Sequence, residues 1–126
     1  MTSDRKVTIA TLEAFADAWN RHAIDDLMSF MTDDCVFEAN AGPDVSGTVF
    51  RGREEVRRGF MRAWQLFPDA RWNDARHFIS GDRGCSEWIF TGTGVDGRPV
   101  EVAGCDIFQF EGDKIAVKNS FRKQRS

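Results

Sequence analysis

Asp106 lies within the segment VAGCDIFQF (residues 102–110), an apolar run whose alternation predicts a buried strand. If its side chain shares a face with Phe108 and Phe110, the carboxylate enters apolar surroundings. Such a placement is costly unless the group is paired, protonated or next to water. A carboxylate held in this way is a candidate general acid or base.

The residue opposite Asp106 depends on the hairpin turn that precedes its strand. A two-residue turn at Asp96-Gly97 would put Glu87 directly across from Asp106. Two opposed carboxylates raise the pKa of at least one of them. A turn one residue longer is expected to place Trp88 opposite Asp106 and to move Glu87 to the other face. The sequence leaves both registers open.

Two further polar residues lie on predicted strands. His77, in ARHFISGD, precedes the hairpin and is expected to face away from Trp72. Asn119 lies between Val117 and Phe121 on an apolar parity of the last strand. Each is either a site residue or a polar group satisfied by the backbone, and the pattern alone favours the second interpretation slightly.

The surrounding pattern predicts helices first and a sheet afterwards. Apolar residues recur at helical spacing from Ile9 to Trp19, from Ile24 to Met31 and from Val56 to Phe67, with a short strand, CVFE, after the second run. Long strands follow at about 71–79, 84–94, 99–110 and 114–122, punctuated by turn signals. This order indicates an α+β fold with helices packed on one sheet face.

Composition limits the classes of function. The 126 residues suffice for a single domain spanning 1–126, and the net charge of −3 argues against a nucleic-acid partner. No apolar stretch approaches the roughly 20 residues of a membrane span, and no signal-peptide core is present, so a cytoplasmic location is expected. Three widely spaced cysteines and two distant histidines predict no disulfide framework and no metal site.

The chain resembles the SnoaL-like branch of the nuclear transport factor 2 (NTF2-like) superfamily over residues 8–122. The segments that carry the resemblance are FADAWNRHAIDDLMSFMTDDCVFEA, FRGREEVRRGF, SEWIFTGTGVDGR and GCDIFQFEGDKI. The resemblance implies an NTF2-like, cystatin-like cone, in which three N-terminal helices pack in a strongly curved antiparallel sheet around a deep apolar pocket. It also implies a homodimer through the convex sheet face. In catalytic relatives the aspartate matching Asp106 projects into the pocket.

Residue by residue, the resemblance favours some reactions over others. The superfamily contains polyketide cyclases, ketosteroid isomerases, scytalone dehydratases, limonene epoxide hydrolases and non-catalytic binding modules. Ala39 and Phe15 stand where isomerases carry a base and a tyrosine, and the absence of tyrosine argues against the epoxide hydrolase pattern. His77 matches the dehydratase histidine, but Asn20 replaces its partner aspartate. The cyclase pattern, an aspartate base in the pocket, fits best through Asp106.

The leading hypothesis is therefore an enzyme that needs neither metal nor organic cofactor. Asp106 would remove a proton α to a carbonyl of an apolar substrate, and His77 with Asn20 or Asn119 would stabilise the enolate. Glu87 is a further polar candidate, and the predicted pocket lining comprises Phe15, Trp19, Phe37, Phe60, Trp64, Trp88 and Phe108. One alternative is a non-catalytic module that binds a hydrophobic ligand or a partner chain. Another is a structural role for Asp106, paired with Arg122 or capped by backbone N–H groups.

Overall fold

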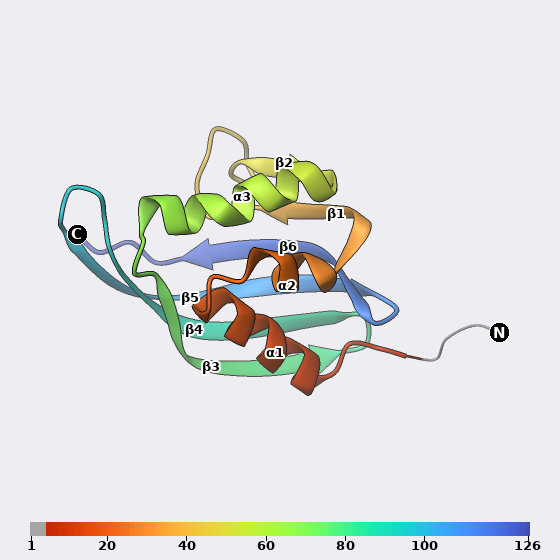
Figure 1. The fold of residues 1–126 in the computed structure, drawn as a ribbon. Coiled ribbons are helices and arrows are strands. Elements are labelled where there is room, and N and C mark those ends of the chain that lie inside the picture. Colours follow the sequence, from red (N-terminus) through yellow and green to blue (C-terminus); the bar gives the residue numbers. More distant parts are fainter. Residues whose placement is uncertain (1–4) are drawn as a thin grey trace.

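A computed structural model describes residues 5–126 and shows three helices on one face of a six-stranded sheet (Figure 1). The helices are α1 (Ile9–Asn20), α2 (Ile24–Ser29) and α3 (Gly52–Leu66). The strands are β1 (Met31–Glu38), β2 (Val49–Arg51), β3 (Arg71–Ser80), β4 (Arg83–Thr93), β5 (Pro99–Glu111) and β6 (Lys114–Arg122). No helix in this part of the chain is long and apolar enough to cross a membrane.

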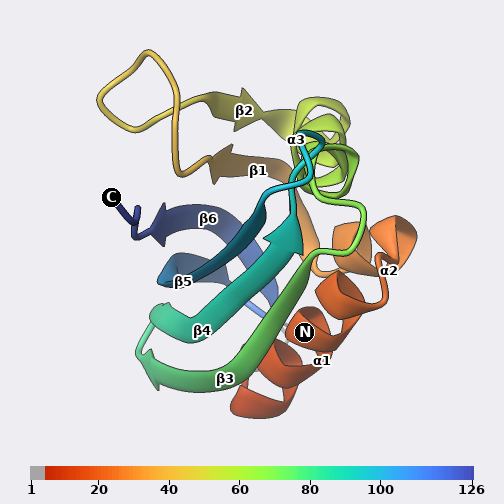
Figure 2. The ribbon, with the colours of Figure 1, turned by 90° about the vertical axis from the view of Figure 1, so that its left-hand side faces the viewer.

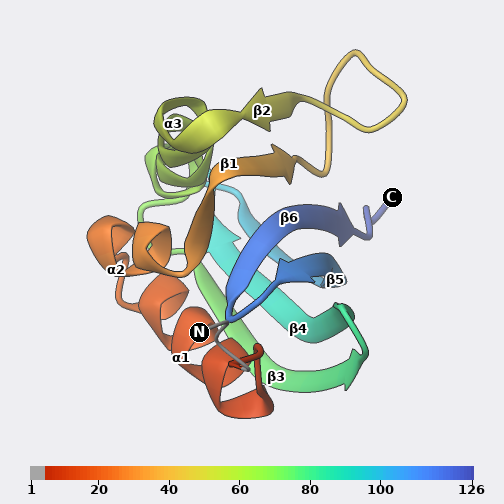
Figure 3. The same ribbon diagram turned by 90° about the vertical axis from the view of Figure 1, so that its right-hand side faces the viewer.

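The sheet order is β2-β1-β6-β5-β4-β3. Strands β3 to β6 form the predicted antiparallel meander, but β1 pairs with β6 in parallel, so the sheet is mixed and not wholly antiparallel as expected. β1 and β6 are far apart in the sequence and are not joined by a hairpin. They can therefore lie parallel to each other at the β6 edge of the meander. Figures 2 and 3 show the sheet curving around α1 and α3, with the concave face toward the helices.

Helix signals in the sequence agree with the positions of α1 and α3, whereas the run expected to be helical up to Met31 ends at Ser29 and the strand expected at CVFE already begins at Met31. Thr8 caps α1 through a reciprocal pair of contacts with Thr11, which satisfies backbone groups that a helix end leaves open. The Glu55 carboxylate accepts a hydrogen bond from the backbone N–H of Arg51 at the start of α3. Because both helices start at defined residues, their apolar faces are fixed toward the sheet.

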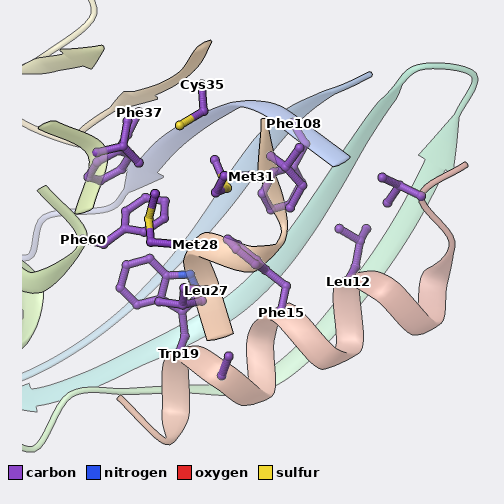
Figure 4. Close-up of a cluster of buried hydrophobic side chains, with 14 residues drawn as sticks. Leu12, Phe15, Trp19, Leu27, Met28, Met31, Cys35, Phe37, Phe60 and Phe108 are labelled. Carbon is purple, nitrogen blue, oxygen red and sulfur yellow. The ribbon is translucent and has the colours of Figure 1, made fainter. Parts of the chain in front are cut away.

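The main core fills the space between the helices and the concave face (Figure 4). Phe15 is central to it and makes edge-to-face contacts with Trp19, Phe30, Phe60 and Phe108. Edge-to-face pairs of this kind contribute about 0.5–1.5 kcal/mol each beyond burial alone. The rings of α1 are therefore held rigidly against β5, the strand that carries Asp106.

Two bulges decide which side chains face the core. In β3 the register shifts by one residue between Asn73 and Arg76, where Asp74 has a φ of 57°. The extra residue puts Trp72 and His77 on the same concave face, which corrects the expectation that they point apart. In β6 a similar shift lies between the pairs Gln109–Val117 and Phe110–Ile115.

Candidate active site

Asp106 lies near the middle of β5 on the concave face and is 6% exposed. Its Oδ1 lies 3.0 Å from Lys118 Nζ and accepts a 2.6 Å hydrogen bond from Ser120 Oγ. Its Oδ2 accepts a 3.0 Å hydrogen bond from Trp88 Nε1. The carboxylate is therefore buried as an ion-paired, hydrogen-bonded group. These contacts offset the free-energy cost of removing its charge from water.

Lys118 is the other buried charge of this site, at 5% exposure. Its Nζ also donates to Ser120 Oγ at 2.8 Å, and it lies 4.9 Å and 4.7 Å from the ring centroids of Trp19 and Phe37. Contacts with aromatic faces stabilise a desolvated ammonium group. Of the three N–H donors of the ammonium group, two are used by Asp106 and Ser120, which leaves one for another acceptor.

Sequence reasoning missed Lys118 and Ser120, because it assigned the opposite parity to β6. The bulge at the start of β6 turns Lys118, Ser120 and Arg122 toward the concave face. Asn119 instead pairs with Ile107 on the convex face, so it does not reach the site. The structural alternative that paired Asp106 with Arg122 is also corrected, since the partner is Lys118.

The β4–β5 hairpin differs from both registers considered for it. Gly94 and Arg98 close a three-residue loop in which Gly97 has a φ of 81°, the geometry of a type I turn followed by a bulge. The loop is one residue longer than a two-residue turn, but this lengthening shifts the register in the direction opposite to the one expected. Ser86, and neither Glu87 nor Trp88, lies opposite Asp106, while Glu87 moves to the other face as expected for a longer turn.

In this register the adjacent residues Glu87 and Trp88 point to the convex and the concave face of β4, respectively. Glu87 is on the convex face, where its carboxylate lies 3.4 Å from Arg76. Trp88 pairs with Gly104 in the ladder and lies on the concave face, from which its indole reaches Asp106. Glu87 is thus excluded from the pocket, whereas Trp88 belongs to the site.

His77 joins the site indirectly. Its ring Nδ1 lies 2.7 Å from Ser86 Oγ, and Ser86 faces Asp106 across the strand pair. Burial lowers the pKa of His77, and the nearby charge of Glu13 opposes this shift. The neutral imidazole is therefore favoured in the folded protein. Asn20 has a structural role, since its amide exchanges two hydrogen bonds with the backbone of Trp72, 2.9 Å and 2.7 Å long.

Two adjoining cavities lie beside the ion pair. The larger has a volume of about 420 Å³ and runs between α3, the segment after β1 and the concave face of the sheet. The smaller, of about 20 Å³, is lined by Asp106 and Ser86 and has room for about one water molecule. Trp19, Trp72, Trp88 and Lys118 line both cavities.

Most of the predicted lining residues lie at these cavities. Trp19 and Trp88 line both of them, Phe37 lines the larger one, and Phe15 and Phe108 line the smaller one. Phe60 and Trp64 line neither cavity. Phe60 is fully buried in the core, and Trp64 stacks on His22 with ring centroids 4.9 Å apart.

The family model of the SnoaL-like domain matches residues 12–118, which run from within α1 to the middle of β6. The chain belongs to the SnoaL-like domain family. No curated protein shows significant sequence similarity to this SnoaL-like chain.

Solved structures share its fold at low sequence identity. A proposed polyketide cyclase from Xanthomonas campestris pv. campestris is 18% identical, with a TM-score of 0.81 over 96% of this chain and 93% of the other. A Catenulispora acidiphila protein with a ketosteroid isomerase-like fold, in complex with trimethylamine, is 18% identical, with a TM-score of 0.76 over 87% and 82%. TerC, co-crystallised with polyporic acid, is 14% identical, with a TM-score of 0.76 over 91% and 90%. Other structures with this arrangement are described as NTF2-like or cystatin-like.

Proposed function

We propose that this SnoaL-like domain is an enzyme that performs general acid–base chemistry on an apolar, carbonyl-bearing small molecule. The observation that carries the proposal is the buried Lys118–Asp106 ion pair, whose lysine lines the 420 Å³ cavity. Buried charges are rare unless they are paired, and they concentrate where proton transfer or charge stabilisation is needed. The reaction is a cyclisation, isomerisation or dehydration, the classes that share enolate chemistry.

The cavity suits an apolar substrate that has a hydrogen-bond acceptor. Its volume lies within the roughly 300–1,000 Å³ typical of small-molecule sites. Its inner end offers the remaining N–H of Lys118. A substrate carbonyl oxygen placed there would accept this hydrogen bond.

The proposed step balances one proton. The Asp106 carboxylate takes a proton from the carbon next to the carbonyl, and the electron pair moves onto the carbonyl oxygen. The Lys118 ammonium group stabilises the resulting enolate, and Asp106 returns the proton at a second position. In this scheme His77 is a positioning residue, because it contacts Ser86 and not the carboxylate.

The second candidate is a non-catalytic module that binds a hydrophobic ligand. Both oxygens of Asp106 already accept hydrogen bonds, and the cavity beside them holds only about 20 Å³. These contacts favour a carboxylate that holds Lys118 in place while the larger cavity binds a ligand. The co-crystallisation of TerC, a protein of similar fold, with polyporic acid supports this candidate. The two candidates differ in whether bound ligand is converted.

A thermal-shift screen of apolar ketones, aldehydes and polyketide-like aromatics would separate these candidates. It would use the wild type, Asp106→Asn and the exposed control Asp113→Asn at several pH values, followed by product analysis. The enzyme predicts ligands that stabilise all three proteins and turnover that is absent only in Asp106→Asn. Stabilisation without turnover in any of them would identify the binding module. If none of the compounds stabilised any of the three proteins, both candidates would be contradicted.

We also propose a homodimer through the convex face of the sheet. Phe78 and Phe121 are 56% and 50% exposed on this face, beside the partly buried Ile89 and Ile107. Exposed apolar side chains that cluster on one face are typical of protein interfaces. A partner copy would cover them without touching the cavity on the concave face.

A cytoplasmic location remains part of the proposal. Cys35, Cys85 and Cys105 are free thiols. Burial, with the neighbouring Cys105, raises the pKa of Cys85 to about 12, so this thiol stays protonated and unreactive at neutral pH. Free cysteines are the usual state in a reducing compartment.

A further inference from the structure

The 420 Å³ cavity is lined by cations without a carboxylate among the described residues. Lys118, Arg62 and Arg122 contribute to the lining, and its other polar members are neutral. The chain as a whole has 20 acidic and 17 basic residues, so the positive lining is a local feature and does not follow from the overall charge. This distribution favours a negatively charged occupant.

The three cations differ in how their charge is balanced. Lys118 is neutralised by Asp106 at the inner end, and Arg62 is exposed at the mouth. Arg122 is partly buried, and its guanidinium carbon lies 4.6 Å and 5.6 Å from the ring centroids of Phe90 and Phe67. Arg122, like Lys118, lies against aromatic rings, but it is the partly buried cation that no carboxylate of the described residues neutralises.

The guanidinium of Arg122 has no hydrogen bond or ion pair with any residue in the described range 5–126. Its five N–H donors are therefore open to a ligand. Burial lowers the pKa of Arg122, which reflects the cost of desolvating a charge that lacks an anionic partner. A carboxylate that accepts two parallel N–H hydrogen bonds from one edge of the guanidinium is the acceptor that best offsets this cost.

Lys118, Ser120 and Arg122 alternate along β6 and all line the cavity. Four residues of strand separate the Cα atoms of Lys118 and Arg122 by about 13 Å. An elongated molecule with its carbonyl at Lys118 would therefore present its other end to Arg122, nearer the mouth.

We infer that the ligand of this cavity is an organic anion, an acid group on an aromatic or aliphatic body, with the acid group bound by Arg122. The inference rests on the proposed function, since it names the substrate class of the same cavity. It predicts selectivity for acids over neutral molecules of the same shape.

Calorimetric titration with matched probes tests this selectivity. The probes are 2-naphthoate with 2-naphthamide and decanoate with decanamide, each an anion beside a neutral carbonyl compound of similar size. We expect the wild type to bind the anion of at least one pair about tenfold or more tightly than the amide. Arg122→Met should abolish this preference, and Arg122→Lys should retain part of it.

Arg98→Met is the matched control, because it removes one cation whose side chain is 87% exposed on the β4–β5 hairpin. Its preference for the anion should equal that of the wild type. Arg122→Gln provides a second neutral variant if Arg122→Met does not melt cooperatively. Loss of preference in Arg98→Met as well would attribute the effect to overall charge and overturn the inference.

The remaining outcomes distinguish this inference from the proposed function. Amides that bind as tightly as the anions, or more tightly, would overturn the anion inference and leave the carbonyl-binding cavity intact. Failure of all four probes to bind at millimolar concentration would overturn the proposed ligand site and the inference together.

Discussion

Lys118 and Asp106 form an ion pair whose two side chains are only 7% and 8% exposed, with Nζ 3.0 Å from Oδ1. Removing one partner leaves the other charge buried without compensation. We expect Asp106→Asn to lower the free energy of unfolding by about 3–5 kcal/mol, measured by urea denaturation. Asp113→Asn, at an exposed turn, should change it little.

The double variant Asp106→Asn/Lys118→Met tests whether this loss comes from the unpaired ammonium group. Because the second substitution removes the stranded charge, the double variant should be more stable than Asp106→Asn alone. If the loss of unfolding free energy in the double variant equals the sum of the losses in Asp106→Asn and in Lys118→Met, the two residues are not coupled. The account of their burial as a pair would then be wrong.

Gly104→Ala is predicted to disturb the site from the sheet side. A Cβ at this position would lie 2.5 Å from Trp88 Cη2 and 2.5 Å from the backbone oxygen of Phe121. The indole of Trp88 would have to move, which weakens its hydrogen bond to Asp106. We expect a loss of about 1–3 kcal/mol in urea denaturation, together with a shift in tryptophan fluorescence.

Gly92→Ala is the matched control for that substitution, because its Cβ would meet the side chain of Phe67 at 3.1 Å. A contact of this length requires only a small adjustment, so the loss of stability should be smaller. Equal losses in the two variants would show that the close approach of Trp88 to Gly104 has no special role.

His77 predicts a pH dependence of stability. Because burial lowers its pKa in the folded state, the unfolded chain binds a proton more readily as the pH falls. The stabilisation is fully present above the unfolded value of 6.5 and is lost as the pH falls through the lower folded value. His77→Gln should remove this component of the unfolding free energy. Urea denaturation between about pH 7.5 and 5, from about one unit above to about one and a half units below the reference pKa of 6.5, measures this component. Parallel profiles of the unfolding free energy for the two proteins would contradict it.

The proposed dimer predicts that a charge on the convex face produces monomers. Phe121→Lys should dissociate the dimer, because burying an unpaired ammonium group at an apolar interface is costly. Sedimentation velocity measures the change from dimer to monomer. A protein concentration on the order of tens of micromolar suits the affinity expected of a modest interface. Val95→Lys, at an exposed position of the β4–β5 turn, is the control. A wild type that sediments only as a monomer would contradict the dimer.

The helices and the long strands were predictable because their signals are local. The spacing of apolar residues in α1 and α3 and the turn residues between β3, β4, β5 and β6 led to boundaries within a residue or two for the four long strands. The family resemblance supplied the curvature of the sheet, and the matched SnoaL-like domain confirms that assignment. Asp106 was identified from its own strand, where a carboxylate stands among apolar residues.

The partners of Asp106 were not predictable in the same way, because bulges and turn length decide them. One extra residue in β6 brings Lys118 inward and turns Asn119 outward. One extra residue in the hairpin loop places Ser86, and not Glu87, opposite Asp106. The preference of Gly97 for positive φ fits either turn length, so the dipeptide Asp96-Gly97 could not distinguish them.

The signal that could have revealed Lys118 is the spacing on the last strand. Ile115 and Lys118 are both buried although they are three positions apart, an odd spacing that requires a bulge between them in a strand. Without the structure, a lysine in the middle of a strand is more often taken for a solvated residue.

The central claim is that Asp106, paired with Lys118, removes a proton from the carbon next to a carbonyl. Deuterium exchange measures this step directly, by NMR of ketones that bind the protein in D2O, without knowledge of the final product. The account predicts exchange at the α-carbon with the wild type and none above background with Asp106→Asn, which still binds the ketone, or with Asp106→Asn/Lys118→Met, which has also lost the ammonium donor to the carbonyl. Equal exchange with all three proteins, or none with a wild type that binds the ketone, would contradict it.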